Sequence, residues 1–497
     1  MRAAGGNAVL LLALKHVGEF RQATTADVHC PAPVTGPRGS EISRLLGRDG
    51  GIGKSRISSG RPSDVESTCT ARSGFFDCVR PRIHLRLRDV ITVFLNGITA
   101  FSMAPPEIAG LSPRDRHLFG PGPKRMLSLD GGGVRGAIAI GFLERLESLI
   151  QEVEGRPTLL CDWFDFIGGT STGAIIAGAL ALGYRAADVR KFYLALGPRV
   201  FRRSFWRIVG LMSKFDRRNL ISELEGILGD RTLDSDDLRT GLGVVAKRLD
   251  TGSCWVIANN PRSKYWDTPS DRAFVGNRYY RLTNLIRASA AAPHYFDPEL
   301  IEIIANEPPG LFVDGGLTPH NNPALQLFLY AALPQYGLSW SLGPENLTIV
   351  SIGTGGFRPH VSVNELAWIR PIGMAIRALS GQITESAQLV LTLMSWLGDT
   401  PTAWPINSEL ADVAGVPAPR GQPLFRFLRY DIRLEQDWLA RELGVELEPR
   451  TLSKYQLMDA PENIPAIYEL GARAAERQIT RDHLIARPMS LDDAGHA

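Results

Sequence analysis

Short apolar runs alternate with helical patterns through the middle of the chain, starting near Lys124. Met126–Leu129 reads as a strand, and apolar positions then recur at helical spacing at Ile138, Phe142, Leu146 and Leu149. The alternation returns with a strand at Phe164–Gly168 and a helix after Ser171, a strand at Leu311–Val313 and a helix from Ala324, and a strand at Leu347–Ile352. This order predicts an α/β fold with a mostly parallel central sheet covered by helices on both faces.

The same pattern divides the chain into three parts. Residues 1–122 show little sustained periodicity and contain breaker-rich patches, so we expect a poorly ordered N-terminal extension. Residues 123–360 carry the strand–helix alternation and form the predicted α/β domain. Residues 361–497 are expected to be mainly helical and to pack on that domain.

Composition excludes several classes of protein. The 497 residues include 55 basic and 52 acidic ones, and a net charge of +3 does not indicate a nucleic-acid partner. Five cysteines without repeated spacing fit neither a zinc site nor a disulfide framework, so we expect reduced thiols in a cytoplasmic protein. No uncharged run reaches the roughly 18 to 20 apolar residues of a membrane-spanning helix, and Ala8–Leu14 makes no convincing signal peptide.

Three further segments suggest ligand or membrane contacts. Gly47–Ser55 looks like a phosphate-binding loop, but Arg48 stands where that motif needs a glycine, which argues against nucleotide binding. Phe201–Arg218 mixes arginines with aromatic residues, including Phe205 and Trp206, and is the better candidate for touching anionic lipid. Trp368–Leu397 is a long apolar helical pattern, which we interpret as a core helix rather than an interfacial lid.

A serine framed by glycines follows the second predicted strand. Gly169-Thr170-Ser171-Thr172-Gly173 fits the G-x-S-x-G pattern, in which the glycines remove Cβ atoms that would collide at a sharp strand-to-helix turn. Such a turn exposes the serine hydroxyl at the end of the sheet. A glycine-rich turn without chemistry is the alternative for this motif taken alone.

A second glycine-rich turn follows the first predicted strand. Asp130-Gly131-Gly132-Gly133-Val134-Arg135-Gly136 combines a strand end, three glycines and a helix start, which can present several backbone N–H groups at one point. Beside an exposed serine, these amides would stabilise an oxyanion, whereas phosphate binding is the alternative. Arg135 would either brace the loop or face an anionic head group.

The serine needs a base. His294, His320 and His360 lie near plausible loops, but the sequence assigns none of them a partner carboxylate. Asp314, at the end of the strand Leu311–Val313 and followed by Gly315 and Gly316, is the stronger candidate. An ordinary Asp pKa of about 3.9 is too low for a base at neutral pH, so a working Asp314 would need burial. The alternative is a turn or cap aspartate.

Together, these motifs resemble the patatin-like phospholipase family. DGGGVRG at 130–136, GTSTG at 169–173 and DGG at 314–316 are similar in content and order to its oxyanion loop, nucleophile elbow and dyad aspartate. Segments 287–296 and 351–355 look like further blocks of the family, and the resemblance covers about 124–356. It implies a three-layer patatin-like fold and a Ser-Asp dyad that uses no histidine, so His294 is not expected to have a chemical role.

Carried over to this sequence, the resemblance implies a lipid acyl hydrolase of the phospholipase A type. Ser171 would be the nucleophile and Asp314 the base, and the loop of Gly131, Gly132, Gly133 and Arg135 would form the oxyanion hole. Gly169 and Gly173 would shape the elbow, and Gly315 and Gly316 the aspartate loop. The implied substrate is a membrane phospholipid or another acyl lipid, with no cofactor, no metal and no nucleic acid; peripheral membrane contact is left open. The alternative is a catalytically silent member that binds lipid or a partner.

Overall fold

The computed structural model describes residues 110–200, 217–293, 295–358, 371–413 and 415–485. All of them belong to one compact unit, residues 102–497, and the other unit, residues 1–101, lies outside the described residues. The sequence-based predictions for Gly47–Ser55, for Phe205 and Trp206, and for His294 and His360 therefore concern residues that are not described.

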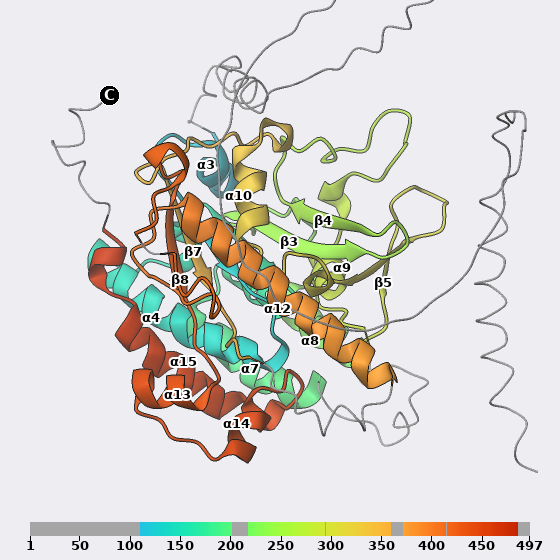
Figure 1. The fold of residues 1–497 in the computed structure, drawn as a ribbon. Coiled ribbons are helices and arrows are strands. Elements are labelled where there is room, and N and C mark those ends of the chain that lie inside the picture. Colours follow the sequence, from blue (N-terminus) through green and yellow to red (C-terminus); the bar gives the residue numbers. More distant parts are fainter. Residues whose placement is uncertain (1–109, 201–216, 294, 359–370, 414, 486–497) are drawn as a thin grey trace, which may run out of the picture. The chain divides into compact units, whose positions relative to one another are not determined.

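An eight-stranded sheet runs through the described residues (Figure 1). Its strands are β1 (Lys124–Leu129), β2 (Phe166–Thr170), β3 (Gly241–Arg248), β4 (Ser253–Ala258), β5 (Glu299–Ile301), β6 (Gly310–Asp314), β7 (Leu347–Ile352) and β8 (Arg426–Tyr430). The order is β5-β6-β3-β2-β1-β7-β8, with β4 paired to β3 outside this path. β3, β2, β1, β7 and β8 are parallel, whereas β4, β5 and β6 join through antiparallel pairs.

Helices lie on both faces of this sheet. They are α3 (Pro113–Phe119), α4 (Gly136–Glu154), α5 (Leu160–Trp163), α6 (Thr172–Ala181), α7 (Ala186–Val200), α8 (Arg217–Leu228), α9 (Leu282–Ser289), α10 (Ala324–Ala332), α12 (Pro371–Leu397), α13 (Gln436–Trp438), α14 (Pro449–Tyr455) and α15 (Ile464–Gln478). Successive strand residues alternate between two cores: Met126 and Phe166 pack with α3, α10 and α12, whereas Leu127 and Ile167 pack with α4, α6, α7, α8, α9 and α15. The predicted fold class, a mostly parallel sheet covered on both faces, is confirmed.

Two strands meet end to end along one edge of β3. β2 runs parallel to β3 and its last residue, Thr170, pairs with Val245, whereas β6 runs antiparallel and its last residue, Asp314, pairs with Ala246. β4 pairs with Gly243–Arg248 and so occupies the other edge of β3. The carboxyl ends of β2 and β6 therefore point at each other, and the residues that follow them are brought together.

The ends of the described unit differ from what the sequence suggested. α3 lies within the predicted N-terminal extension, yet Leu118 is buried and its carbonyl accepts a hydrogen bond from Trp340 Nε1 at 2.8 Å. The C-terminal part contributes β8, which pairs with β7, besides its helices. Sequence periodicity did not reveal this strand, because Arg426–Tyr430 is short and its polar and apolar residues do not alternate. The domain boundaries at 122 and 360 stay predictions.

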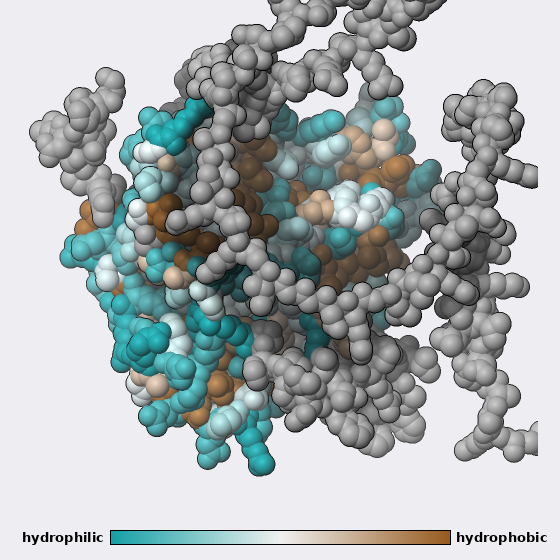
Figure 2. Space-filling view, viewed as in Figure 1, coloured by the Kyte–Doolittle hydropathy of each residue, from teal (hydrophilic) through white to brown (hydrophobic). Residues whose placement is uncertain are grey.

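α12 is buried at some positions and exposed at others. Val390, Leu391 and Met394, in its C-terminal half, are buried in the core with α10, whereas Met374 and Leu379 near its start are exposed. Figure 2 shows that apolar residues on this face of the molecule form patches separated by hydrophilic ones. In the described part of the chain, no helix is long and apolar enough to cross a membrane.

The crossing of α4 and α15 yields a stability prediction. A Cβ added to Gly141 would lie 2.5 Å from Ala472 N, so Gly141→Ala must push the two backbones apart and should destabilise by about 1–3 kcal/mol. Gly381, inside α12, has no atom within 4 Å of the same position, and Gly381→Ala should stabilise by about 0.5–1 kcal/mol. Urea unfolding measures both. Equal effects of the two substitutions would contradict the close contact.

Candidate active site

Ser171 occupies a strained turn between β2 and α6. Its backbone has φ 54° and ψ −123°, a left-handed conformation that costs energy for a residue with a side chain. The predicted elbow glycines stand where no side chain fits: a Cβ on Gly169 would lie 2.2 Å from Gly173 C, and one on Gly173 would lie 2.2 Å from Leu129 O. The elbow therefore packs directly on the end of β1.

A buried serine from α9 holds this turn. The Ser171 N–H donates to Ser289 Oγ at 2.8 Å, and Ser289 Oγ donates to the Val245 carbonyl at 2.6 Å. Ser289 is fully buried and ties the elbow to β3 at the point where β2 stops. The sequence analysis gave Ser289 no role, because its partner Val245 is 44 residues away.

Ser171 and Asp314 are in direct contact. Ser171 Oγ donates to Asp314 Oδ2 at 2.6 Å, and the Gly316 N–H donates to Asp314 Oδ1 at 2.7 Å. Burial raises the pKa of Asp314 to about 6, although the bonds from Ser171 and Gly316 act to lower it. A Cβ on Gly315 would lie 2.3 Å from Val245 O, so this glycine lets the aspartate loop turn against β3. A buried carboxylate whose pKa lies near neutrality is able to accept a proton.

The glycine loop after β1 lies against the elbow, since a Cβ on Gly131 would come within 3.2 Å of Ser171 Cβ. The Gly131 N–H donates to the Asn321 carbonyl at 3.0 Å, so this amide, predicted to receive the oxyanion, already has an acceptor. Within the part of the chain that the structure describes, the Gly132 and Gly133 amides donate to no protein acceptor. These two amides are the ones available for an anion.

Neighbouring groups fix how the two available amides point. The Gly131 carbonyl accepts from Thr354 Oγ1 at 2.9 Å and from Asn321 Nδ2 at 3.3 Å. Because C=O and N–H point in opposite directions across a trans peptide, these bonds orient the Gly132 N–H. The Gly132 carbonyl accepts the Arg135 N–H at 3.2 Å, which orients the Gly133 N–H in the same way.

Arg135 and His320 do not contact the Ser171–Asp314 pair through hydrogen bonds. The buried Arg135 guanidinium donates to the Gly355 carbonyl at 2.8 Å, which corresponds to the bracing alternative of the sequence analysis. Burial lowers the pKa of His320, and its Nδ1 has no partner among the described residues. Only the His320 carbonyl takes part near the site, by accepting from Thr170 Oγ1 at 2.6 Å.

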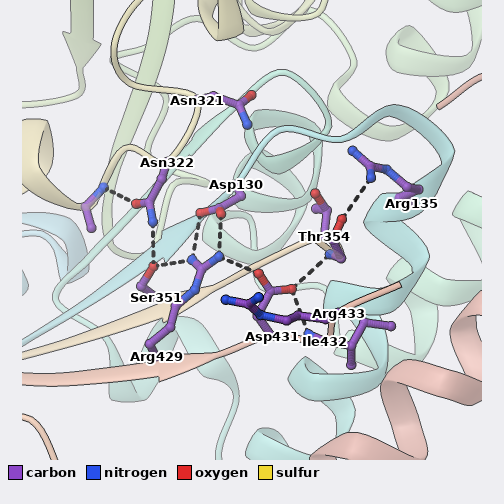
Figure 3. A network of polar contacts seen from close by, with 12 residues as sticks. Asp130, Arg135, Asn321, Asn322, Ser351, Thr354, Arg429, Asp431, Ile432 and Arg433 are labelled. Carbon is purple, nitrogen blue, oxygen red and sulfur yellow. Dashed lines mark hydrogen bonds and ion pairs between the residues drawn. The ribbon is translucent and has the colours of Figure 1, made fainter. Parts of the chain in front are cut away.

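A buried charge cluster includes Asp130, the residue before the glycine loop (Figure 3). Arg429, on β8, donates through Nη1 and Nη2 to the two carboxylate oxygens of Asp130 at 3.1 and 2.8 Å. Arg429 Nη2 also donates to Asp431 at 2.7 Å, and Nη1 to Ser351 Oγ at 2.8 Å. The sequence analysis missed this cluster, because its members lie 299 residues apart and no local pattern marks Arg429. In the described residues, no group of three or more His, Cys, Asp or Glu could hold a metal ion.

The fold and this geometry define an α/β protein whose elbow serine contacts a buried aspartate beside a glycine loop. Residues 127–328 match the family model described as patatin-like phospholipase. Patatin group M-3 of Solanum tuberosum is 29% identical over 246 residues, covering 46% of this chain and 60% of that protein. Patatin-like protein 1 of Arabidopsis thaliana is 29% identical over 258 residues, covering 46% and 58%.

Residues 127–328 are therefore similar to patatin-like phospholipases, and the resemblance inferred from the motifs is confirmed. The chain spans about 60% of the length of the curated relatives it matches. A solved structure of human GIVD cytosolic phospholipase A2 in complex with methyl γ-linolenyl fluorophosphonate is 12% identical, covering 73% of this chain and 58% of that one, at a TM-score of 0.33.

The Ser289 bridge yields a second stability prediction. Ser289→Ala leaves the Ser171 N–H and the Val245 carbonyl without their partner, and should destabilise the protein by about 1–3 kcal/mol. Ser395 is a matched control, since it is also buried and its Oγ has no partner among the described residues. Ser395→Ala should be close to neutral in chemical denaturation, and a comparable loss for both variants would contradict the assigned bridge.

Proposed function

We propose that this protein is a lipid acyl hydrolase of the phospholipase A type, with Ser171 as nucleophile and Asp314 as base. The observation that carries the proposal is the 2.6 Å hydrogen bond from the hydroxyl of a strained elbow serine to a buried carboxylate. The match of residues 127–328 to the patatin-like phospholipase family supports the same chemistry.

In the proposed first step, Asp314 accepts the Ser171 proton as Oγ attacks the ester carbonyl carbon. The carbonyl electron pair moves onto oxygen, and the Gly132 and Gly133 amides stabilise this oxyanion. When the intermediate collapses, the leaving alcohol takes the proton from Asp314, and the acyl group stays on Ser171. Water then gives a proton to Asp314 and attacks the acyl carbonyl, which releases the fatty acid and returns the proton to Ser171.

This assignment refines the expected oxyanion hole. Gly131 shapes the loop but has given its N–H to Asn321, so the two donors are Gly132 and Gly133. Gly133 has φ +58°, and a Cβ there would lie 2.2 Å from the Met458 carbonyl, so the loop depends on glycine at this position. Arg135 supports the loop from behind through Gly355.

The substrate proposal follows from the family. We propose a membrane phospholipid or a related acyl lipid, bound by a cytoplasmic protein that contacts the membrane at its surface. The exposed apolar residues of α12 support surface contact with lipid; they are Met374, Leu379, Leu389 and Trp396.

Serine-directed labelling tests the nucleophile. A fluorophosphonate should label wild-type protein on Ser171, and wild type should hydrolyse a fatty-acyl ester. Ser171→Ala and Asp314→Asn should each lower kcat by at least about 10³-fold, because the dyad acts as one unit. Ser128→Ala is the control, since Ser128 is fully buried on β1 and its Oγ has no partner among the described residues. Wild-type protein that neither labels nor turns over any acyl ester would refute the enzyme.

The raised pKa of Asp314 predicts the pH profile. Asp314 must be ionised to accept a proton, so kcat/KM should level off above pH 6 and fall about tenfold per pH unit below its pKa of about 6. Burial also raises the pKa of Asp130 to about 6. Asp130→Asn should nevertheless keep this acidic limb, because Asp130 has no bond to Ser171. If the acidic limb disappeared in Asp130→Asn, the limb would report the ionisation of Asp130, and its assignment to Asp314 would be refuted.

A further inference from the structure

The strongest unassigned feature is the charge cluster of Asp130, Arg429 and Asp431. It contains one guanidinium between two carboxylates, and the side chains of Arg429, Asp130 and Asp431 are 3%, 7% and 6% exposed. Although burial acts to lower it, the pKa of Arg429 is raised overall by the two carboxylates. Burying charge in this way is unfavourable unless every partner is well placed, so the geometry of the cluster is tightly constrained.

From this geometry we propose that Arg429 is a positioning residue for the oxyanion loop, and that β8 and the residues after it complete the active site from outside the family-matched segment. The proposal rests on the proposed acyl-ester hydrolysis. Two chains of hydrogen bonds connect Arg429 to the loop, one through Asp130 and one through Asp431.

The first route runs through Asp130. This residue directly precedes Gly131, and the Arg429 fork holds both of its carboxylate oxygens. The Asp130 N–H donates to the Ile352 carbonyl at 3.1 Å, so backbone and side chain are both fixed. Asp130 is therefore a rigid start for the glycine loop.

The second route runs through Asp431 and the turn after β7. Asp431 Oδ1 accepts the Gly355 N–H at 2.9 Å, while its Oδ2 accepts from Arg429. Thr354, next to Gly355 in this turn, donates through Oγ1 to the Gly131 carbonyl at 2.9 Å. This bond orients the Gly132 amide, so the position of Arg429 is transmitted to one of the two proposed oxyanion donors.

A separate contact from the same C-terminal region reaches the other end of the loop. The Met458 carbonyl accepts the Val134 N–H at 2.9 Å. The family match ends at residue 328, whereas Thr354, Arg429, Asp431 and Met458 all follow it. The oxyanion loop thus lies in the matched segment but is held in place by residues beyond it.

Arg429→Lys tests the positioning role in the full-length protein. Lysine keeps the charge but loses the planar fork that holds both Asp130 oxygens. Because misplaced donors weaken transition-state binding more than substrate binding, kcat on a p-nitrophenyl fatty-acyl ester should fall about 10- to 100-fold, with KM changed less than about threefold. The acidic limb of the pH profile should not move, because Arg429 does not bond to Asp314.

Arg426→Lys is the matched control. Arg426 is also a buried arginine of β8, but its guanidinium donates to the Asp482 and Ile485 carbonyls, away from the loop. This substitution should alter thermal stability at most and leave kcat per folded molecule within about twofold of wild type, since Asp482 and Ile485 lie outside the loop and its supporting residues. Equal losses of kcat in both arginine variants would reduce Arg429 to a stability role and overturn the proposal.

Thr354→Val gives a second test if Arg429→Lys does not fold. Valine has nearly the shape of threonine but cannot donate to the Gly131 carbonyl, so kcat should fall about tenfold with KM unchanged. Full kcat in Thr354→Val would overturn the proposal. Wild-type protein inactive on all acyl esters would instead refute the proposed function itself, so the two failures are distinguishable.

Discussion

The site depends on one feature of the sheet, the meeting of β2 and β6 along a single edge of β3. β2 ends opposite Val245 and β6 ends opposite Ala246, which are adjacent residues of β3. The carboxyl ends of the two strands therefore lie next to each other. Ser171 follows one strand and Asp314 ends the other, so sheet hydrogen bonding brings the two side chains together. Ser289 closes the remaining gap by bonding to both the elbow and Val245.

The environment of Asp314 then decides its chemistry. The same close packing that joins the strands removes water from the carboxylate, and burial raises its pKa to about 6. The Gly316 amide and the Ser171 hydroxyl keep the ionised form accessible by hydrogen bonding to it. A carboxylate of this kind can act as a base at neutral pH without a histidine. Among the described residues, His320 takes part near the site through its carbonyl, which accepts from Thr170 Oγ1.

The glycine loop is held rigid by groups that are distant from it in the sequence. Asn321, Thr354 and Met458 each bond to the loop backbone, and Arg429 fixes its first residue, Asp130. Glycines give the loop close backbone approach but no stiffness of their own. The stiffness is supplied by Asn321, Thr354 and Met458 and by Arg429 on β8, all of which follow the loop in the sequence.

The sequence by itself determined the fold class, the elbow, the glycine loop and Asp314, because each is a local pattern of strand end, glycine and helix start. It predicted Gly131 as an oxyanion donor, whereas in the structure the Gly131 N–H donates to the Asn321 carbonyl, and it missed Ser289, β8 and Arg429. Local motifs state which backbone shapes are allowed, but not which donor already has an acceptor elsewhere. The use of the Gly131 amide by Asn321, and the pairing of Asp130 with Arg429, were decided only by the tertiary structure. Both contacts join residues at least 190 positions apart in the sequence. The periodicity of apolar residues predicts local elements only and cannot predict contacts over such separations.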